Sequence, residues 1–170
     1  ANMALFGTGV DGGLAGVVRV PERALACITP SAREIAPPLL ALAEPLSCCL
    51  RARTRLPITS TSRVLILGTG PIGLIHCALA GAAGASVMAC GRPARLDPAL
   101  ALGASTVTAS QGDELVATVR EWSGGAGADV VIIAVGDPGL VPIAAQCTAI
   151  GGYISCFAGF PAGTLAQIDP

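Results

Sequence analysis

The sequence predicts an α/β fold of the Rossmann type, a doubly wound parallel sheet with helices on both faces. Three observations indicate this fold. From residue 63 onward, apolar strand-like runs alternate with runs that are compatible with helices. A Gly-x-Gly-x-x-Gly pattern follows the first of these strands directly, at residues 68–73. The 170 residues, 52% of them apolar, also suffice for the core of one domain and part of another.

Charge and composition exclude several classes of function. Charged residues make up 12% of the chain, the net charge is −1, and the longest basic cluster is Arg51, Arg53 and Arg55, so we expect no nucleic acid as a partner. No uninterrupted apolar stretch reaches the roughly 18 residues of a membrane-spanning helix, so we expect no membrane partner either. All ten basic residues are arginine, which excludes mechanisms that require a lysine of this chain.

The seven cysteines are scattered through the sequence, and none of them forms a Cys-x-x-Cys pair. Their neighbours are mostly apolar. This distribution is typical of the buried thiols of a cytoplasmic protein, and it does not indicate a disulfide framework or a self-contained zinc cluster.

Residues 1–52 are interpreted as part of a second domain together with a connecting helix. Leu14–Val20 and Ala24–Ile28 are expected to be two short strands, which bury too little to be stable without partner strands elsewhere. The run from 35 to 52, interrupted by prolines, predicts helix. Glu44 stands among apolar residues in this run, and its position alone favours a helix-end acid.

The glycine pattern is the centre of the predicted domain, which comprises residues 53–170. Arg63–Leu67 reads as a buried strand, and a helix-compatible run begins after the last glycine. The first glycine permits a tight turn, the second leaves room for a pyrophosphate, and the third lets the helix approach the sheet. A proline suits the first turn of such a helix, whose free N–H groups face the phosphates. The candidate cofactor-binding residues here are Gly68, Gly70, Pro71, Ile72 and Gly73.

The remaining elements continue the alternation of strand and helix. In order they are Ser86–Cys90 (strand), Ala94–Leu102 (helix), Thr106–Thr108 (strand), a helix from Gly112 through Trp122, Asp129–Val135 (strand), Leu140–Thr148 (helix) and Gly152–Phe157 (strand). This makes five strands, and the sixth strand of a complete Rossmann sheet is missing from the pattern. We place Val135, Gly136 and Phe157, at the ends of the last two strands, among the candidate cofactor-binding residues.

The turn after the second strand bears on the choice of cofactor. An acid at this position would bind the adenosine ribose hydroxyls of NAD, but the sequence has Gly91 there, followed by Arg92 and, further on, Arg95. Two arginines suit a 2′-phosphate, because guanidinium binds phosphate through two parallel hydrogen bonds. The pattern therefore favours NADP over NAD. Alternatively Arg92 stacks on the adenine, and either cofactor would bind.

Several segments occur together in the order and spacing of one enzyme family. They are Asp11–Ala15, Val18–Pro21, Ala43–Leu46, Val64–Leu74, Gly103–Ala104, Gly127–Val131, Gly159–Thr164 and Ile168–Pro170. With these motifs the chain resembles the zinc-dependent medium-chain alcohol dehydrogenases, in particular their sorbitol and threonine dehydrogenase branch. Agreement of several motifs over nearly the whole chain is more specific than one glycine pattern.

The resemblance implies an NAD(P)-dependent oxidation of a small-molecule alcohol or polyol, with zinc as the Lewis acid. Glu44 matches the glutamate that lies at the catalytic zinc in polyol-type members, as a direct or water-mediated ligand. The family's other zinc ligands would precede Asp11, so we identify no catalytic residue in this chain. Residues 1–52 would then be a remnant of the β-rich catalytic domain, and residues 53–170 a Rossmann domain that is incomplete at its C-terminus.

Two further expectations follow from the resemblance. The isolated chain should have little or no dehydrogenase turnover, and a non-catalytic NADPH-binding or interaction module, left by truncation, is the alternative function. Residues around Gly151 to Phe157 commonly pair subunits in this family, so a homo-oligomer is expected.

Overall fold

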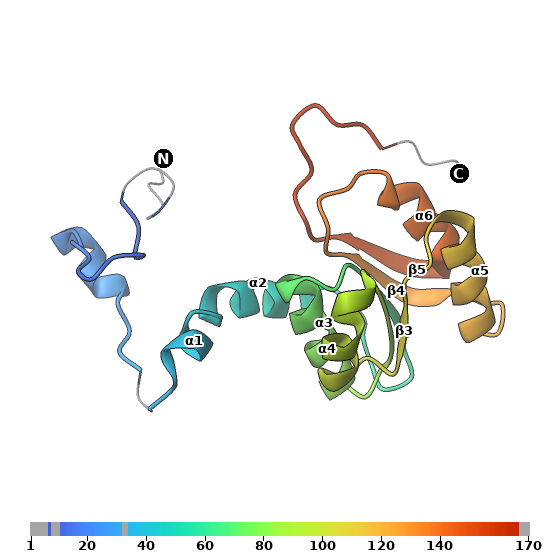
Figure 1. Cartoon of the computed structure of the whole chain (residues 1–170), viewed down its shortest axis with the longest axis horizontal. Helices are drawn as coiled ribbons and strands as arrows, with labels where there is room; N and C mark the ends of the chain where they lie inside the picture. The colour runs from blue at the N-terminus through green and yellow to red at the C-terminus, as the bar shows by residue number, and fades with distance from the viewer. Residues whose placement is uncertain (1–6, 8–10, 32–33, 167–170) are drawn as a thin grey trace. The chain divides into compact units, whose positions relative to one another are not determined.

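The computed structural model describes residues 7, 11–31 and 34–166. The chain divides into two compact units, residues 1–40 and 41–170, and Figure 1 shows the elements of each. The motif at Ile168–Pro170 lies outside the described residues. Within the described ranges, no helix is both long enough and apolar enough to cross a membrane.

The larger unit is built on one parallel sheet of five strands. They are β1 (Arg63–Leu67), β2 (Ser86–Cys90), β3 (Thr106–Thr108), β4 (Ala128–Ile133) and β5 (Thr148–Cys156). Their order is β3-β2-β1-β4-β5, and every neighbouring pair is parallel. This is the order of the first five strands of a doubly wound dinucleotide-binding sheet, so the predicted fold class is confirmed.

Apart from α2, which precedes β1, the helices of this unit connect its strands and cover the sheet. The helices are α2 (Ala43–Arg53), α3 (Pro71–Ala82), the 3₁₀ helix η2 (Pro93–Arg95), α4 (Leu96–Ala101), α5 (Gly112–Trp122) and α6 (Leu140–Cys147). The predicted helix from 94 to 102 is therefore divided, with a 3₁₀ turn before α4. The prolines likewise break the predicted helical run of 35–52 before α2.

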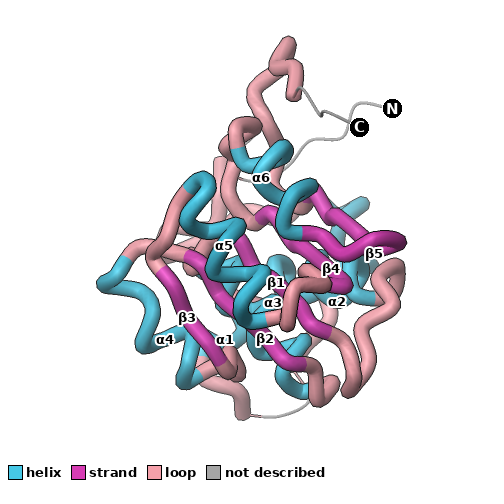
Figure 2. Tube along the Cα trace, turned by 90° about the vertical axis from the view of Figure 1, so that its right-hand side faces the viewer, coloured by secondary structure: helices cyan, strands magenta, loops and turns pink. Residues whose placement is uncertain are grey.

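Two apolar cores lie on the two faces of the sheet, because successive side chains of a buried strand point to opposite sides. On one face, Val64 and Ile66 of β1 pack with α3 and α4. On the other face, Leu65 and Leu67 pack with α5 and α6. Figure 2 shows the strands with α5 and α6 on the side nearer the viewer. The alternating helices and strands of the sequence thus produce a three-layer unit.

Strand β5 begins at Thr148, earlier than the Gly152 that the sequence predicted. Ala128 of β4 pairs with Thr148, but Val130 pairs with Tyr153, so the register shifts between the two pairs. Gly151, with a φ of +76°, lies in this irregular stretch. The extra residues of a bulge interrupt the alternation from which a strand is predicted, which hides the first part of β5.

The two strands predicted in the smaller unit are wrong. Residues 14–20 contain no strand, and Glu22–Cys27 form a short 3₁₀ helix, η1. Leu14 and Val17 are 106% and 89% exposed, so the apolar side chains that suggested a strand are not buried. A strand requires pairing and a buried face, and the described part of this unit supplies neither. The unit also contains the short helix α1 (Pro37–Leu40).

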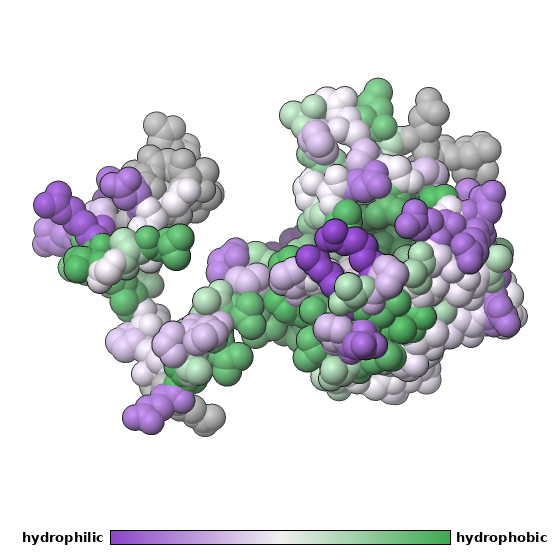
Figure 3. All heavy atoms as spheres, in the orientation of Figure 1, coloured by the Kyte–Doolittle hydropathy of each residue, from purple (hydrophilic) through white to green (hydrophobic). Residues whose placement is uncertain are grey.

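Helix α2 packs beside α3 in the larger unit and buries Cys49. Its outer side is apolar, since Leu46 and Leu50 are 36% and 45% exposed. Figure 3 shows apolar surface along this helix. The helix therefore contributes both to the packing around α3 and to an uncovered apolar surface.

An ion pair joins the beginnings of β1 and β4, at the edge of the sheet opposite the glycine loop. The Arg63 guanidinium donates to both carboxylate oxygens of Asp129, with Nε to Oδ2 at 3.2 Å and Nη2 to Oδ1 at 3.1 Å. The backbone N–H of Arg63 also donates to Oδ2, at 2.7 Å. Arg63 Nη1 donates to the carbonyl oxygen of Ser123 at 2.8 Å. The pair thereby connects two strands and the loop before β4.

We predict that Asp129→Ala lowers the free energy of unfolding by about 1–2 kcal/mol, because it removes the acceptor of three hydrogen bonds. The partial exposure of the pair limits the loss. Urea unfolding measures it, followed by the fluorescence of Trp122, a partly buried residue at the end of α5 that packs against the core. Glu121→Ala, which removes an exposed carboxylate of α5, is the control and should change stability by less than about 0.5 kcal/mol.

The stability difference between the parent chain and Asp129→Ala should also depend on pH in a defined direction. The hydrogen bond from Arg63 lowers the pKa of Asp129 below its ordinary value of 3.8. The ion pair's contribution to the free energy of unfolding is therefore fully present above about pH 4. It is lost as the pH falls through the lower pKa that Asp129 has in the folded state. The stability difference between the parent chain and Asp129→Ala should shrink in strong acid, and a difference that persists there would contradict the ion pair.

His76 is a neutral residue of the core. It lies in α3, is 2% exposed, and meets the ring of Phe157 edge-on at a centroid distance of 4.6 Å. Its Nε2 atom has no hydrogen-bond partner among the described residues. Burial lowers the pKa of His76 to about 4, since a charge would be poorly solvated there. The imidazole therefore carries an unsatisfied nitrogen inside the fold.

We predict that His76→Leu stabilises the chain at pH 7 by about 1 kcal/mol, since it removes a buried polar atom without a partner. In the parent chain, unfolding allows His76 to take up a proton between its unfolded pKa near 6.5 and its folded pKa of about 4. The parent should therefore lose stability as the pH falls through this window, and the advantage of His76→Leu should grow by about 3 kcal/mol. Urea unfolding at several pH values tests this. An advantage that stays constant from pH 7 to pH 4 would show that the imidazole is not held neutral.

Candidate nucleotide-binding site

The carboxyl ends of the central strands meet at one edge of the sheet, and backbone hydrogen bonds continue past the strands. The N–H of Gly68, directly after β1, donates to the carbonyl oxygen of Cys90 at 2.8 Å. The N–H of Gly91, directly after β2, donates to the carbonyl oxygen of Thr108 at 3.0 Å. The connection after β1 leads to β2, and the connection after its other neighbour β4 leads in the opposite direction to β5, so a topological switch point lies between β1 and β4 at this edge. Both loops therefore begin from fixed positions at the place where such sheets bind ligands.

The glycine loop brings α3 against the end of β1. A Cβ on Gly73 would overlap the carbonyl oxygen of Gly68 and would lie 2.9 Å from its carbonyl carbon. Gly68 has a φ of +109°, and a Cβ there would overlap the side chain of Val135, which follows β4. Space therefore requires glycine at both positions, and at Gly68 the backbone conformation favours it as well. This is the packing role that the sequence motif predicts for them.

The N-terminus of α3 is open to an anion. Gly70 is its N-cap in an extended conformation, Pro71 follows, and no side chain caps the helix. The first-turn N–H groups, including those of Ile72 and Gly73, have no acceptor within the helix. Arg95 approaches the same loop, because its Nη1 lies 3.7 Å from the position of a Cβ on Gly70. An anion at this loop would thus meet both the positive end of the helix and a guanidinium.

A cavity of about 200 Å³ lies at the same edge. Gly68, Arg92 and Val135 line it together with Gly91, so three of the predicted residues meet there. Its volume is below the roughly 300–1,000 Å³ of pockets that enclose a whole small ligand. The cavity can therefore hold part of a dinucleotide, and the remainder would lie along the open edge of the sheet.

The turn after β2 directs its two arginines to different places. Arg92 is exposed and lines the cavity, and its carbonyl oxygen accepts the N–H of Arg95 at 2.9 Å. Arg95 is the residue that reaches the glycine loop. The position after β2 carries no carboxylate, since Gly91 occupies it. The turn thus offers two positive charges to a ligand at this edge.

Sequence reasoning missed the loop after β3. Ser110 and Gln111 line the cavity, together with Cys90 at the end of β2. Cys90 Sγ donates to the carbonyl oxygen of Ser110 at 3.3 Å, and Thr108 Oγ1 donates to Ser110 Oγ at 2.9 Å. Burial raises the pKa of Cys90 to about 11, so its thiol is protonated at neutral pH. The signal that could have found this loop is its place after a parallel strand, because the carboxyl ends of all such strands share one edge.

Of the three residues predicted at the ends of β4 and β5, only Val135 lines this cavity. A Cβ on Gly136 would lie 2.9 Å from the carbonyl oxygen of Gly159, so the loops after β4 and β5 are in contact there. Phe157 packs against His76 instead. The role of Gly136 and Phe157 in cofactor binding stays a prediction.

Glu44 lies in the first turn of α2 and is exposed. Its Oε1 accepts a hydrogen bond from Cys48 Sγ at 3.2 Å, and this bond raises the pKa of the Cys48 thiol. Among the described residues, no group of three or more His, Cys, Asp or Glu side chains could hold a metal ion. Zinc sites in proteins use about four ligands. Glu44 and Cys48 alone therefore do not fit a zinc centre.

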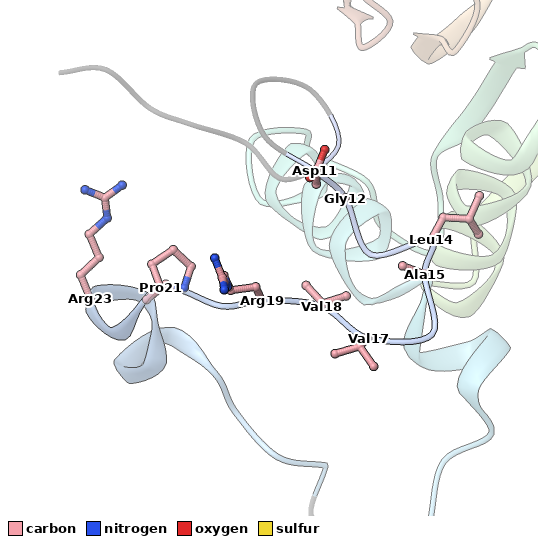
Figure 4. Close-up of a pocket in the computed structure, with 10 residues that line it drawn as sticks. Asp11, Gly12, Leu14, Ala15, Val17, Val18, Arg19, Pro21 and Arg23 are labelled. Atoms are coloured by element: carbon pink, nitrogen blue, oxygen red, sulfur yellow. The ribbon is translucent and has the colours of Figure 1, made fainter.

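A larger cavity, of about 820 Å³, lies within the smaller unit and is lined by residues between Asp11 and Ala24. Figure 4 shows these side chains along a loop that doubles back on itself and leads into η1, which carries Arg23. Leu14 and Val17 in this loop are almost fully exposed. This hollow is lined by exposed side chains of a loop, whereas the loops at the edge of the sheet are hydrogen-bonded to one another, so the edge of the sheet is the stronger candidate site.

Two curated dehydrogenases are similar to this chain along nearly its whole length. The chain is 33% identical to L-threonine 3-dehydrogenase of Symbiobacterium thermophilum over 170 residues, which cover 99% of this chain and 47% of the relative. It is 31% identical to L-galactonate-5-dehydrogenase of Escherichia coli, over 99% of this chain and 48% of the relative. The chain thus spans about half the length of these curated relatives.

A solved structure from Sinorhizobium meliloti, described as a zinc-binding dehydrogenase bound to NADP, superposes with a TM-score of 0.68 at 32% identity. The superposition covers 76% of this chain and 39% of that one. The family model described as zinc-binding dehydrogenase matches residues 71–170, more than half of the chain. This match includes α3 and the turn after β2. The chain therefore belongs to the zinc-binding dehydrogenase family, as its motifs indicated.

Proposed function

We propose that this chain supplies the NADP-binding half of an oxidoreductase that transfers hydride between a small-molecule alcohol or polyol and the cofactor. Relatives named as threonine and galactonate dehydrogenases support the substrate class. The observation that carries the proposal is the pair Gly91 and Arg92 at the cavity. A glycine there offers no carboxylate to the ribose, and the guanidinium beside it matches a phosphate.

Each part of the site has a physical role in this proposal. The pyrophosphate lies at the N-terminus of α3, where Gly70 leaves it room and Arg95 adds a positive charge. The adenosine ribose lies at the cavity beside Gly91, and Arg92 donates hydrogen bonds to the 2′-phosphate. Val135, packed on Gly68, forms the wall toward β4. When bound, a nicotinamide cofactor supplies the hydride acceptor or donor.

The main alternative at this site is NAD with Arg92 stacked on the adenine. In that case the guanidinium would contribute to both nucleotides alike. The two arrangements differ in how the removal of Arg92 changes the ratio of the two dissociation constants.

We predict that the parent chain binds NADPH more tightly than NADH. Arg92→Ala should weaken the binding of NADPH by about tenfold or more and should change the binding of NADH little. The reason is that a charge-assisted, bidentate contact to phosphate is lost, and only NADPH makes it. A titration that follows nicotinamide fluorescence and thermal stability together measures both dissociation constants.

Arg51→Ala is the matched control, since Arg51 is an exposed arginine on α2 that does not line the cavity. It should leave both dissociation constants unchanged. An unaltered NADPH-to-NADH ratio in Arg92→Ala would contradict the phosphate contact. The absence of binding of either nucleotide to the parent would contradict the proposed function itself.

A non-catalytic NADPH-binding or interaction module is the second candidate. It is favoured by the finding that the described residues do not make a metal centre. Glu44 is proposed to contribute to a zinc site only with ligands from outside the described residues. An oxidoreductase and an NADPH-binding module both require nucleotide binding, whereas a pure interaction module does not, and alcohol-dependent reduction of NADP⁺ by the complete protein distinguishes the enzyme from both modules.

We also propose a cytoplasmic, self-associating protein. Strand β5 is an edge of the sheet, and its Ile150, Tyr153 and Ile154 are exposed. An uncovered apolar edge favours pairing with another strand. Sedimentation equilibrium of the purified chain measures the association.

A further inference from the structure

Thr69 and Gly91 are in contact at the candidate site. Thr69 lies between the first two glycines of the loop after β1 and is 3% exposed. Gly91 is the first residue after β2. Strands β1 and β2 are neighbours in the sheet, so the two loops leave it side by side. The Thr69 side chain fills the space between them.

Glycine at position 91 is required by space and not by backbone conformation. Gly91 is not among the glycines with a left-handed φ, so its backbone conformation is open to other residues. A Cβ at this position would overlap Oγ1 of Thr69, and would lie 2.7 Å from its Cγ2 and 2.8 Å from its Cβ. Non-bonded carbon atoms pack at about 3.5–4.0 Å. The threonine side chain therefore occupies the volume that any side chain at position 91 would need.

The overlap cannot be relieved by a change of rotamer. Rotation about χ1 moves Oγ1 and Cγ2 of Thr69, but its Cβ is fixed by the backbone. Alanine at position 69 would keep this Cβ, and only glycine would remove all three contacts. The loop after β1 has little freedom to move away from Gly91. The N–H of Gly68 is hydrogen-bonded to the carbonyl oxygen of Cys90, and Gly68 is packed closely against the side chain of Val135.

We propose that Thr69 is a determinant of cofactor preference, because its side chain keeps position 91 free of the carboxylate that would bind the ribose hydroxyls of NAD. This inference rests on the proposed NADP site. Arg92 attracts the 2′-phosphate, and Thr69 excludes the competing arrangement. The preference is thus divided between two loops, and substitution at position 91 alone cannot reverse it.

The test is a double-substitution cycle with Gly91→Asp, Thr69→Gly and the pair together, compared with the parent chain. Dissociation constants for NADPH and NADH, and the midpoint of thermal unfolding without nucleotide, are measured for each. Gly91→Asp alone should lower the midpoint and weaken both nucleotides. The double variant Gly91→Asp with Thr69→Gly should recover most of the thermal midpoint that Gly91→Asp alone loses. Its ratio of NADPH to NADH affinity should shift toward NADH by about tenfold or more relative to the parent.

Two further variants distinguish the steric effect of a side chain at position 91 from the effect of its negative charge. Gly91→Ala brings a Cβ without a carboxylate, so Thr69→Gly should restore its thermal midpoint but should not improve NADH binding. Thr69→Ala should restore the midpoint of Gly91→Asp only in part, since one close carbon contact remains. This order of Gly above Ala above Thr at position 69 is the signature of a steric block.

Three results would overturn the inference. One is a Gly91→Asp chain that keeps its thermal midpoint and prefers NADH while Thr69 is present. Another is a double variant, Gly91→Asp with Thr69→Gly, whose midpoint of thermal unfolding is no higher than that of Gly91→Asp alone. If the parent itself binds neither nucleotide, the proposed function fails together with the inference, and the thermal cycle alone then reports whether the contact exists.

Discussion

The close approach of α3 to the end of β1 is the constraint on which the rest of the larger unit depends. No side chain fits between the start of the helix and the carbonyl of Gly68, so Gly73 is required there. This contact aims the helix N-terminus at the edge of the sheet and fixes the loop on which Thr69 is held. The turn after β2 then has to fit against Thr69, and it does so with the bare backbone of Gly91. One tight contact thus determines the shape of both loops that face the candidate ligand.

The fold of residues 63–156 could be predicted largely because its signals are local. Arg63–Leu67 and the glycines form one continuous segment, and the apolar side of α5 repeats within a few residues. The site was predictable only where it shares that segment or follows a strand recognised from it. Ser110, which is distant in sequence from the glycine loop, reaches the cavity through the order of the strands. The contact of Thr69 with Gly91 depends on distances across two loops, which no periodicity contains.

The wrong predictions concern elements whose state is decided by partners. Leu14–Val20 has the composition of a strand, but composition cannot supply the neighbouring strand that would pair with it. The same apolar side chains are exposed in the described structure, so the segment is a loop. The start of β5 was predicted wrongly for a different reason, since a bulge changes which residues face each side of the sheet. The family relationship remains detectable, since it rests on several motifs and on the shared sheet.

The protonated thiol of Cys90 has a practical consequence for chemical modification of the chain. Thiolate is the form that reacts with alkylating reagents and oxidants, and a pKa of about 11 leaves almost none of it at neutral pH. Cys27 and Cys156 are exposed, by contrast, and lie outside the residues that line the cavity. A fluorophore or a spin label can thus be attached at the exposed Cys27 while the partly buried thiol of Cys90 at the candidate site stays unmodified. Oxidants would likewise react with exposed thiols such as that of Cys27 before the protonated thiol of Cys90.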